Sequence, residues 1–224
     1  MRAWMGEGPL SYRSGALLLA GSGVVLSFTA VAFRGVDEAS DWQFLAVRGG
    51  SAAAAMLLLS ALRSRTRPVP WRDADWRIVP AAGLLTAMSM MFILALGQTT
   101  TATVKLLIAA GPLSGAFFGR VFLGERLDPR TIVAMLTAAG GIALMASEGL
   151  DRSSSGFLLA AVIPLLLGMY NMLLRSMPET DPVVPAFLST AALMIISGTV
   201  ALADTGLAMP WPDVLLGVLC GFVL

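Results

Sequence analysis

Two basic residues stand inside long apolar stretches of the sequence, where a positive charge can hold an anionic ligand. Lys105 is the only lysine among fifteen basic residues, and it lies within the stretch 99–119. Arg48 lies at a similar depth within the stretch 42–62. If these stretches cross a bilayer, a charge near its centre costs about 2.5–3.5 kcal/mol on insertion scales, which makes each residue a functional candidate. We expect both side chains to face one cavity.

The position of the acidic residues separates two interpretations of these cations. None of the fourteen carboxylates lies well inside an apolar stretch, which favours a bound molecule with a carboxylate or another anionic group. Alternatively, Arg48 pairs with Asp41 or Glu38, and Lys105 extends its ammonium along a flexible stem to the lipid headgroups. The same distribution argues against a proton relay of Asp or Glu side chains within these residues.

Further polar and helix-breaking residues could complete a ligand site. Pro112 has no backbone N–H, so it removes a helical hydrogen bond in the middle of 99–119 and can bend the helix or free a carbonyl. Pro164 is expected to do the same in 156–174. Tyr170 and Asn171 are the most polar neighbours in that stretch, and we expect them either to bind a substrate or to hydrogen-bond another helix.

The sequence argues against several other kinds of chemistry. It has no histidine and one cysteine, so neither a usual metal cluster nor an internal disulfide is expected. Cys220 lies in an apolar run and is expected to be an inert buried thiol. No Gly-x4-Gly-Lys loop is present, which favours a gradient over ATP as energy source. We predict no cofactor and, with a net charge of +1, no nucleic-acid partner.

Apolar stretches long enough to cross a bilayer must position these residues. Hydrophobic residues make up 57% of the chain, charged residues make up 13%, and the mean hydropathy is +0.80, so lipid is the expected solvent. A helix needs about 20 residues to cross the hydrocarbon core. The sequence predicts seven spans and a short start of an eighth, at 16–33, 42–62, 78–97, 99–119, 131–147, 156–174, 183–203 and 214–224.

The basic residues also predict the orientation of these spans. Lys and Arg accumulate in short cytoplasmic loops. With the N-terminus inside, the outer side keeps only Arg34, Arg48 and Arg152. The cytoplasmic side then carries eleven arginines, which are Arg2, Arg13, Arg63, Arg65, Arg67, Arg72, Arg77, Arg120, Arg126, Arg130 and Arg175. We expect a multi-pass protein of the plasma (inner) membrane with a cytoplasmic N-terminus.

An internal repeat relates two parts of the chain. At an offset of 141 positions, span one aligns with span six, with Arg34 opposite Arg175. At an offset of 140, residues 70–73 (Pro-Trp-Arg-Asp) align with 210–213 (Pro-Trp-Pro-Asp). Five spans separate the copies, so the second copy crosses the membrane in the opposite sense. We predict an all-α, polytopic fold of two inverted five-span repeats, with domains at 1–147 and 156–224, the second truncated in span eight.

The stretch 101–147 carries motifs that resemble a known family. Residues 101–103 (Thr-Ala-Thr) open a span, 111–113 (Gly-Pro-Leu) interrupt it, and 123–127 (Leu-Gly-Glu-Arg-Leu) end it on the cytoplasmic side. A span rich in Ala and Gly follows. The chain resembles the drug/metabolite transporter superfamily, in particular its EamA-type branch. We expect Gly124 and Glu125 to form a structural motif that sets the turn before the next span.

The resemblance implies a fold of ten spans and a transport function. Members of the family move small metabolites, often exporting amino acids or related compounds, and alternating access of paired repeats is the expected mechanism. Arg48 and Lys105 would then bind the anionic end of a substrate, while Tyr170 and Asn171 add polar contacts. The expected partners are the lipid bilayer and a small-molecule metabolite, with a homodimer as one assembly to test.

Two other functions stay open at this stage. The chain could be an inactive, truncated remnant that only inserts into the membrane. A membrane-embedded enzyme is less well supported, because the sequence offers no histidine, no pair of intramembrane carboxylates and no nucleophile beside a base.

The repeat makes a prediction about the gene beyond codon 224. A second copy as long as the first would end near position 288, about 64 residues further on. We therefore expect the nucleotide sequence to continue in frame, with another Gly-Glu pair near position 265. A stop codon directly after Leu224 would contradict this expectation.

Overall fold

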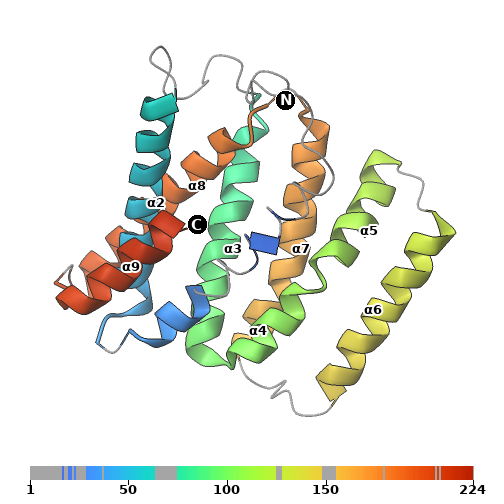
Figure 1. Ribbon diagram of the computed structural model, residues 1–224, viewed down its shortest axis with the longest axis horizontal. Coiled ribbons are helices and arrows are strands. Elements are labelled where there is room, and N and C mark those ends of the chain that lie inside the picture. The colour runs from blue at the N-terminus through green and yellow to red at the C-terminus, as the bar shows by residue number, and fades with distance from the viewer. Residues whose placement is uncertain are drawn as a thin grey trace. The chain divides into compact units, whose positions relative to one another are not determined.

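The computed structural model is helical throughout the part of the chain that it describes (Figure 1). The described residues are 17, 20–21, 23, 29–36, 38–63, 75–124, 128–147, 155–178, 180–204, 206 and 208–223. Within these ranges no residue forms a β-strand. The prediction of an all-α fold is therefore confirmed for this part of the protein.

The helices follow the predicted spans closely. Residues 29–34 are helical and belong to the predicted span one, most of which lies outside the described residues. The labelled helices are α2 (Asp41–Arg63), α3 (Ile78–Gln98), α4 (Thr101–Ile108), α5 (Gly111–Leu123), α6 (Pro129–Ser147), α7 (Ser155–Ser176), α8 (Val183–Asp204) and α9 (Trp211–Val223).

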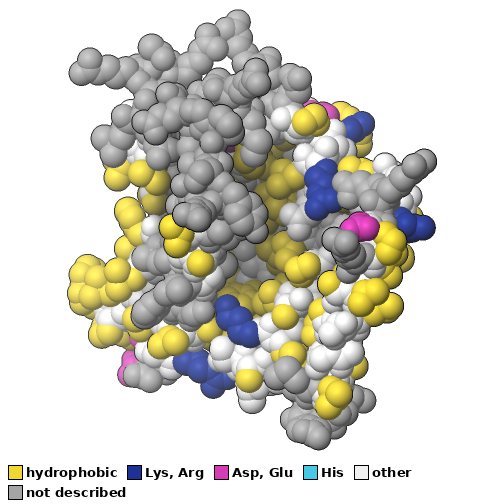
Figure 2. Space-filling model, turned by 45° about the vertical axis from the view of Figure 1, so that its right-hand side comes forward, with side chains coloured by type: hydrophobic (Ala, Val, Ile, Leu, Met, Phe, Trp, Pro, Cys, Tyr) yellow, Lys and Arg dark blue, Asp and Glu magenta, His cyan; other side chains and the backbone are white. Residues whose placement is uncertain are grey.

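Five helical segments are long and apolar enough to cross a membrane. They are Asp41–Ala61, Ile78–Gln98, Thr101–Leu123, Ser155–Ser176 and Val183–Asp204, while Thr131–Leu144 and Trp211–Phe222 are shorter apolar helices. Many large apolar side chains point outward, including Leu136 at 68% exposure and Leu202 at 61%. Figure 2 shows such side chains spread over one face. Lipid suits this surface, because contiguous apolar surface is rare on soluble monomers. The total of spans stays a prediction.

The described helices form two compact units that each draw on a different set of spans. Unit 1 comprises residues 1–74 and 178–224, and its described helices are the end of span one, α2, α8 and α9. Unit 2 comprises residues 75–177 and contains α3 to α7. The units follow contacts between helices, so their boundaries differ from those of the predicted repeats, and the repeat domains stay a prediction.

In unit 1, glycines let α8 and α9 approach α2 closely. A Cβ built at Gly49 would lie 2.9 Å from the Met194 backbone nitrogen on α8, and one at Gly217 of α9 would lie 2.9 Å from Val47 Cγ1. At Gly221 the Arg48 carbonyl oxygen would be only 2.5 Å away. Such approaches need a residue without a side chain, as is common where membrane helices pack. The backbones of α8 and α9 thus fix the position of α2.

Hydrogen bonds tie the chain before α2 to the chain before α9. The Ser40 N–H donates to Gln43 Oε1 at 2.9 Å and Gln43 N–H donates to Ser40 Oγ at 3.3 Å, a reciprocal cap of the helix start. Gln43 Nε2 also donates to the carbonyls of Gly206 and Ala208. Within hydrocarbon or protein, such polar groups need internal partners. This network therefore holds the start of α2 in place.

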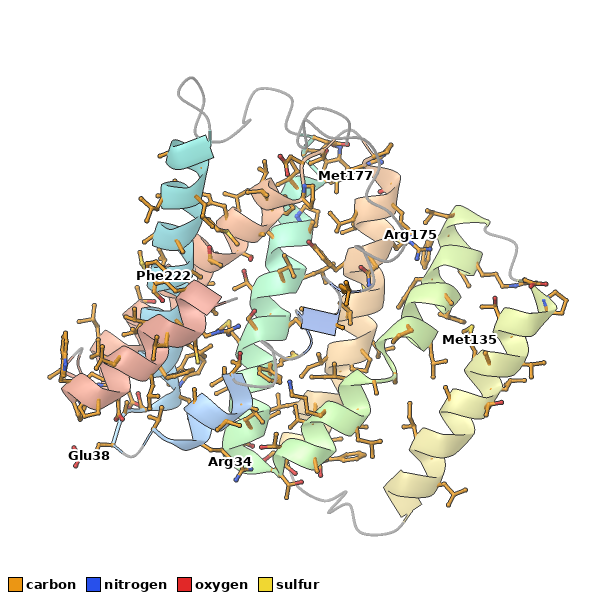
Figure 3. The ribbon with its side chains drawn as sticks, in the orientation of Figure 1. Arg34, Glu38, Met135, Arg175, Met177 and Phe222 are labelled. Carbon is orange, nitrogen blue, oxygen red and sulfur yellow. The ribbon has the colours of Figure 1, made fainter. Side chains whose placement is uncertain are left out.

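Asp213 makes a second tie at the same end of unit 1. Its Oδ2 accepts the backbone N–H groups of Glu38 at 3.2 Å and Ala39 at 3.0 Å, and the side chain is only 3% exposed. Glu38 lies close to the first turn of α9 in Figure 3. A carboxylate in the first turn of a helix also interacts favourably with the helix dipole.

In unit 2, α7 packs against α3, α4 and α5. A Cβ at Gly156 would lie 2.9 Å from Gln98 at the end of α3, and a Cβ at Gly168 would lie 2.8 Å from Ser114 Oγ on α5. The Ser114 hydroxyl donates to the Pro164 carbonyl and, at 2.8 Å, to the Gly111 carbonyl. In Figure 1, α6 lies at the edge of this unit. Helix α7 is therefore the central element of unit 2.

The close contact at Gly49 generates a stability prediction. Gly49→Ala should lower the free energy of unfolding by about 1–3 kcal/mol, because its Cβ would meet the backbone of α8 and force the helices apart. Thermal unfolding in detergent measures the change. Gly83→Ala on α3 is the matched control, since a Cβ there meets nothing within 4 Å. Equal unfolding temperatures for the two variants would contradict the packing described here.

Candidate functional site

Arg48 is a partly buried cation, and two of its donor atoms have no partner among the described residues. It lies in the second turn of α2, directly before the close glycine contact at Gly49. Its Nε and Nη1 atoms are inaccessible to solvent and have no hydrogen-bond acceptor among the residues described. Removing an ion from water costs several kcal/mol unless a counter-charge and hydrogen bonds replace the water. The described residues therefore leave two donors of Arg48 without an acceptor, at a cost in free energy.

The alternative interpretation of Arg48 as half of an ion pair finds no support in the described chain. Neither Asp41 nor Glu38 forms a salt bridge with it there. The backbone N–H of Glu38 is bound to Asp213, and Asp41 begins α2, seven residues before Arg48. Seven residues correspond to about 10 Å along a helix. Asp41 and Arg48 are therefore attached to α2 about two helical turns apart.

Helix α9 supplies one wall beside Arg48. The carbonyl of Arg48 faces Gly221, and the neighbouring Cys220 is buried at 4% exposure. Cys220 directly precedes the glycine at which α9 meets the turn of α2 that contains Arg48. The expected burial of this thiol is confirmed, whereas the contact of its helix with the turn that contains Arg48 was not anticipated.

Lys105 lies in unit 2, on the short helix α4. Its Nζ lies 5.1 Å from the centroid of the Phe92 ring of α3, within the range of a cation–π interaction. The side chain is half-buried. Phe92 was not among the expected site residues, because contacts between helices cannot be read from one sequence. Arg48 and Lys105 fall in different units, so the expectation that they face one cavity stays a prediction.

The stretch that carries Lys105 is divided into two helices. Helix α4 ends at Ile108, and α5 starts at Gly111 with Pro112 in its first turn. The Ala109 N–H donates to the Lys105 carbonyl at 3.1 Å, which closes the last turn of α4. Proline suits the first turn of a helix, where its missing N–H would have no helical partner. The break lies one turn after Lys105.

Pro164 behaves differently from Pro112. It lies inside α7, which continues from Ser155 to Ser176 without interruption. Its carbonyl accepts a hydrogen bond from Ser114 of α5. Serine side chains and neighbouring helices can satisfy backbone groups near a membrane proline, and this allows the helix to continue. In this structure Pro164 serves as a contact point between α5 and α7.

Tyr170 and Asn171 lie in the second half of α7, and both are half-buried. No described residue forms a hydrogen bond with either side chain, so the alternative of a bond between helices finds no support in these parts of the chain. They follow the contact between Gly168 and Ser114, whereas Lys105 precedes the break before α5. The structure therefore places these polar residues and Lys105 at different depths of unit 2.

Gly124 ends α5 in a left-handed conformation with φ of +67°. Its N–H donates to the Gly119 carbonyl, which caps the helix. Glycine is the residue that adopts this conformation most readily, and it commonly follows the last turn of a helix. Glu125, the other half of the predicted motif, lies outside the described residues.

Ser197 of α8 is a buried polar residue that was not among the expected site residues. Its side chain is fully buried, and its Oγ has no hydrogen-bond partner in the residues that the structure describes. Serine is common in membrane helices, so the sequence offers no signal that would single out this one. No group of three or more potential metal-ligating side chains was found among the described residues.

These helices, exposed apolar surfaces and interrupted span define a multi-pass membrane protein. The profile of the EamA-like transporter family matches residues 13–147, which is more than half of the chain. The chain belongs to this family, and it is a membrane transporter of the drug/metabolite kind.

Comparison with solved structures supports the fold. Three solved chains match significantly. One, described only as "Crystal structure of protein", has a TM-score of 0.70 and 20% sequence identity over 95% of this chain and 75% of its own length. Identity at this level indicates a shared fold and nothing more specific. No curated protein sequence matches significantly.

The unpartnered charge predicts an unusual effect of substitution. Arg48→Met should raise the free energy of unfolding by about 1–3 kcal/mol, because an apolar side chain of similar length replaces a buried ion without a counter-charge. Unfolding of the purified protein in detergent, without added anions, measures this change. Arg120→Met, at an exposed position of α5, should change it by less than about 0.5 kcal/mol. Destabilisation by Arg48→Met would instead indicate an ionic partner.

Proposed function

We propose that the protein is a secondary-active transporter that exports small metabolites with an anionic or zwitterionic character, such as amino acids or related compounds. The family provides the class of activity. The substrate type, the direction and the alternating-access mechanism are our inference. A gradient supplies the energy, since the sequence has no P-loop.

One observation carries the choice of substrate: the Nε and Nη1 atoms of Arg48 are buried and have no acceptor among the described residues. An intramembrane cation that is not needed for structure costs free energy, and ligand binding is the usual reason to keep it. An anionic group would supply both the counter-charge and the hydrogen-bond acceptors that the described residues of unit 1 do not provide to these atoms. Arginine suits this role because its donors match the geometry of a carboxylate.

Unit 2, considered by itself, carries the other residues that we propose for substrate binding. Lys105 carries a second positive charge, and the Phe92 ring limits where its ammonium can lie. The polar side-chain groups of Tyr170 and Asn171 form no hydrogen bond with any described residue. The break after α4 allows the turn around Lys105 to move without unfolding a continuous helix. These features suit a site that binds and then releases its ligand.

Helix pairing supports the inverted-repeat part of the proposal. In a five-span repeat, span three corresponds to span eight, and span one corresponds to span six. A contact between spans three and six should therefore have a counterpart between spans eight and one. Span three (α3) packs on span six (α7) in unit 2. In unit 1, a Cβ at Gly35, after span one, would lie 3.6 Å from Leu216 Cδ1 of span eight (α9).

Polar contacts at the helix ends follow the same correspondence. Arg77, directly before α3, donates to the carbonyl of Ser176 at the end of α7. Asp213, at the start of α9, accepts N–H groups from residues just after span one. In both pairs, the first turn of one span is tied to the end of its partner. Inverted repeats of this kind underlie alternating access in many secondary transporters.

The proposal keeps the predicted orientation, with a cytoplasmic N-terminus in the plasma membrane. Its support is the excess of arginines on one side of the spans. Arg175, labelled at the end of α7 in Figure 3, is one of the residues assigned to the cytoplasmic side.

Proteoliposome flux tests the proposed function. Radiolabelled amino acids and small organic anions should move along an imposed gradient, and Arg48→Ala should lower the initial rate at least about tenfold, as expected for losing a charged hydrogen bond to substrate. Lys105→Ala should also lower it, while Lys105→Arg should retain part of the rate.

The exposed Arg120→Ala is the control and should leave flux unchanged. Unchanged flux in both Arg48→Ala and Lys105→Ala would refute the proposed site. If the unaltered protein inserts into liposomes but moves no substrate, the alternative of an inactive membrane protein is favoured.

A further inference from the structure

We propose that Arg48 and Cys220 line one small anion-binding site within unit 1, and that its ligand carries a single negative charge, as a monocarboxylate does. This inference rests on the proposed transport function and adds to it the chemical class of the ligand and a wall of the site. It assigns to the cysteine a place beside the substrate.

The contact between α2 and α9 provides the geometry. A Cβ at Gly221 would lie 2.5 Å from the Arg48 carbonyl oxygen and 2.9 Å from the Ala52 nitrogen. Because these backbones are in such close contact, Cys220 lies beside the turn of α2 that contains Arg48. Cys220 directly precedes Gly221 on α9 and is 4% exposed, and the Nε and Nη1 atoms of Arg48 are inaccessible to solvent. A ligand atom that accepts from Arg48 would therefore lie near the sulfur.

The charges around the site argue for a monoanion. Arg48 offers one positive charge, and no described carboxylate compensates for it. Asp213, on the same helix as Cys220, already accepts two backbone N–H groups and lies seven residues away, about 10 Å along the helix. A carboxylate would neutralise Arg48. A phosphate dianion would leave one uncompensated negative charge in a buried setting, at a cost of several kcal/mol.

The neighbouring surface suits the apolar part of such a ligand. Val47 lies against Gly217 of α9, Phe44 is fully buried on α2, and its ring packs edge-on against Phe33 at 5.2 Å between centroids. Apart from Arg48 and the thiol, these residues present carbon atoms. Small organic acids combine a charged end with an apolar remainder, as binding sites of this composition require.

Charge-selective labelling of Cys220 tests the proposal on the full-length protein. It is the only cysteine, so intact mass reports on this position alone. An anionic methanethiosulfonate (sulfonatoethyl) and a cationic one (trimethylammonioethyl) each react with the thiolate. The new disulfide joins Sγ to the reagent's sulfenyl sulfur, methanesulfinate leaves, and the thiol proton passes to water.

Each labelling rate of Cys220 is divided by the rate at which the same reagent labels a free thiol in solution. We expect this normalised rate to be about tenfold higher for the anionic reagent, because Arg48 attracts the anionic reagent and repels the cationic one. Arg48→Met should abolish this preference, and Arg48→Lys and Arg120→Met should keep it. Propionate in the millimolar range should slow labelling, whereas propylamine should not, and inorganic phosphate should protect less than propionate.

Three results would overturn the proposal. The first is equal normalised rates for the two reagents, and the second is better protection by phosphate than by propionate. The third is labelling only after denaturation, because Cys220 is 4% exposed and must become accessible when the site opens. The experiment needs no gradient and no flux. Labelling can therefore fail while transport is observed, and the reverse, which separates this inference from the proposed function.

Discussion

Hydrocarbon cannot hydrogen-bond, and the structure depends on this constraint throughout. Buried polar groups between the helices must find partners within the protein. Asp213 is bound to two backbone N–H groups, Gln43 to two carbonyls, and Ser114 to the carbonyls of Gly111 and Pro164. Against this background, the Nε and Nη1 atoms of Arg48 are an exception, since they have no acceptor among the described residues.

The second determinant is the absence of side chains at a few helix contacts. Gly49 and Gly221 bring α8 and α9 against the two sides of α2, and Gly168 brings α7 against α5. Lipid gives helices no hydrophobic reason to associate, so close van der Waals contact has to supply much of the attraction. The same contacts place Cys220 next to Arg48. Packing and the proposed site in unit 1 therefore depend on the same glycines.

Where the sequence gave strong local signals, its predictions were close to the structure. The apolar stretches 42–62 and 183–203 correspond to α2 (Asp41–Arg63) and α8 (Val183–Asp204), because length and hydropathy are local properties. The interruption near Pro112 was also anticipated. The stretch 99–119 ends four residues before α5 does, since the helix continues until Gly124 caps it. The glycine was noted as a motif, but its role as the helix end needed the backbone.

By itself, the sequence determined the helical, membrane-spanning class of the protein, the approximate spans and the rarity of charge within them. It also singled out Arg48 and Lys105 as candidates. Only the tertiary structure decided what lies next to them, with α9 packed against the turn of α2 that contains Arg48 and Phe92 beside Lys105. The reason is physical. Hydropathy and helix breaks depend on neighbours in sequence, whereas the partner of a buried charge depends on which helices pack together, often from distant parts of the chain.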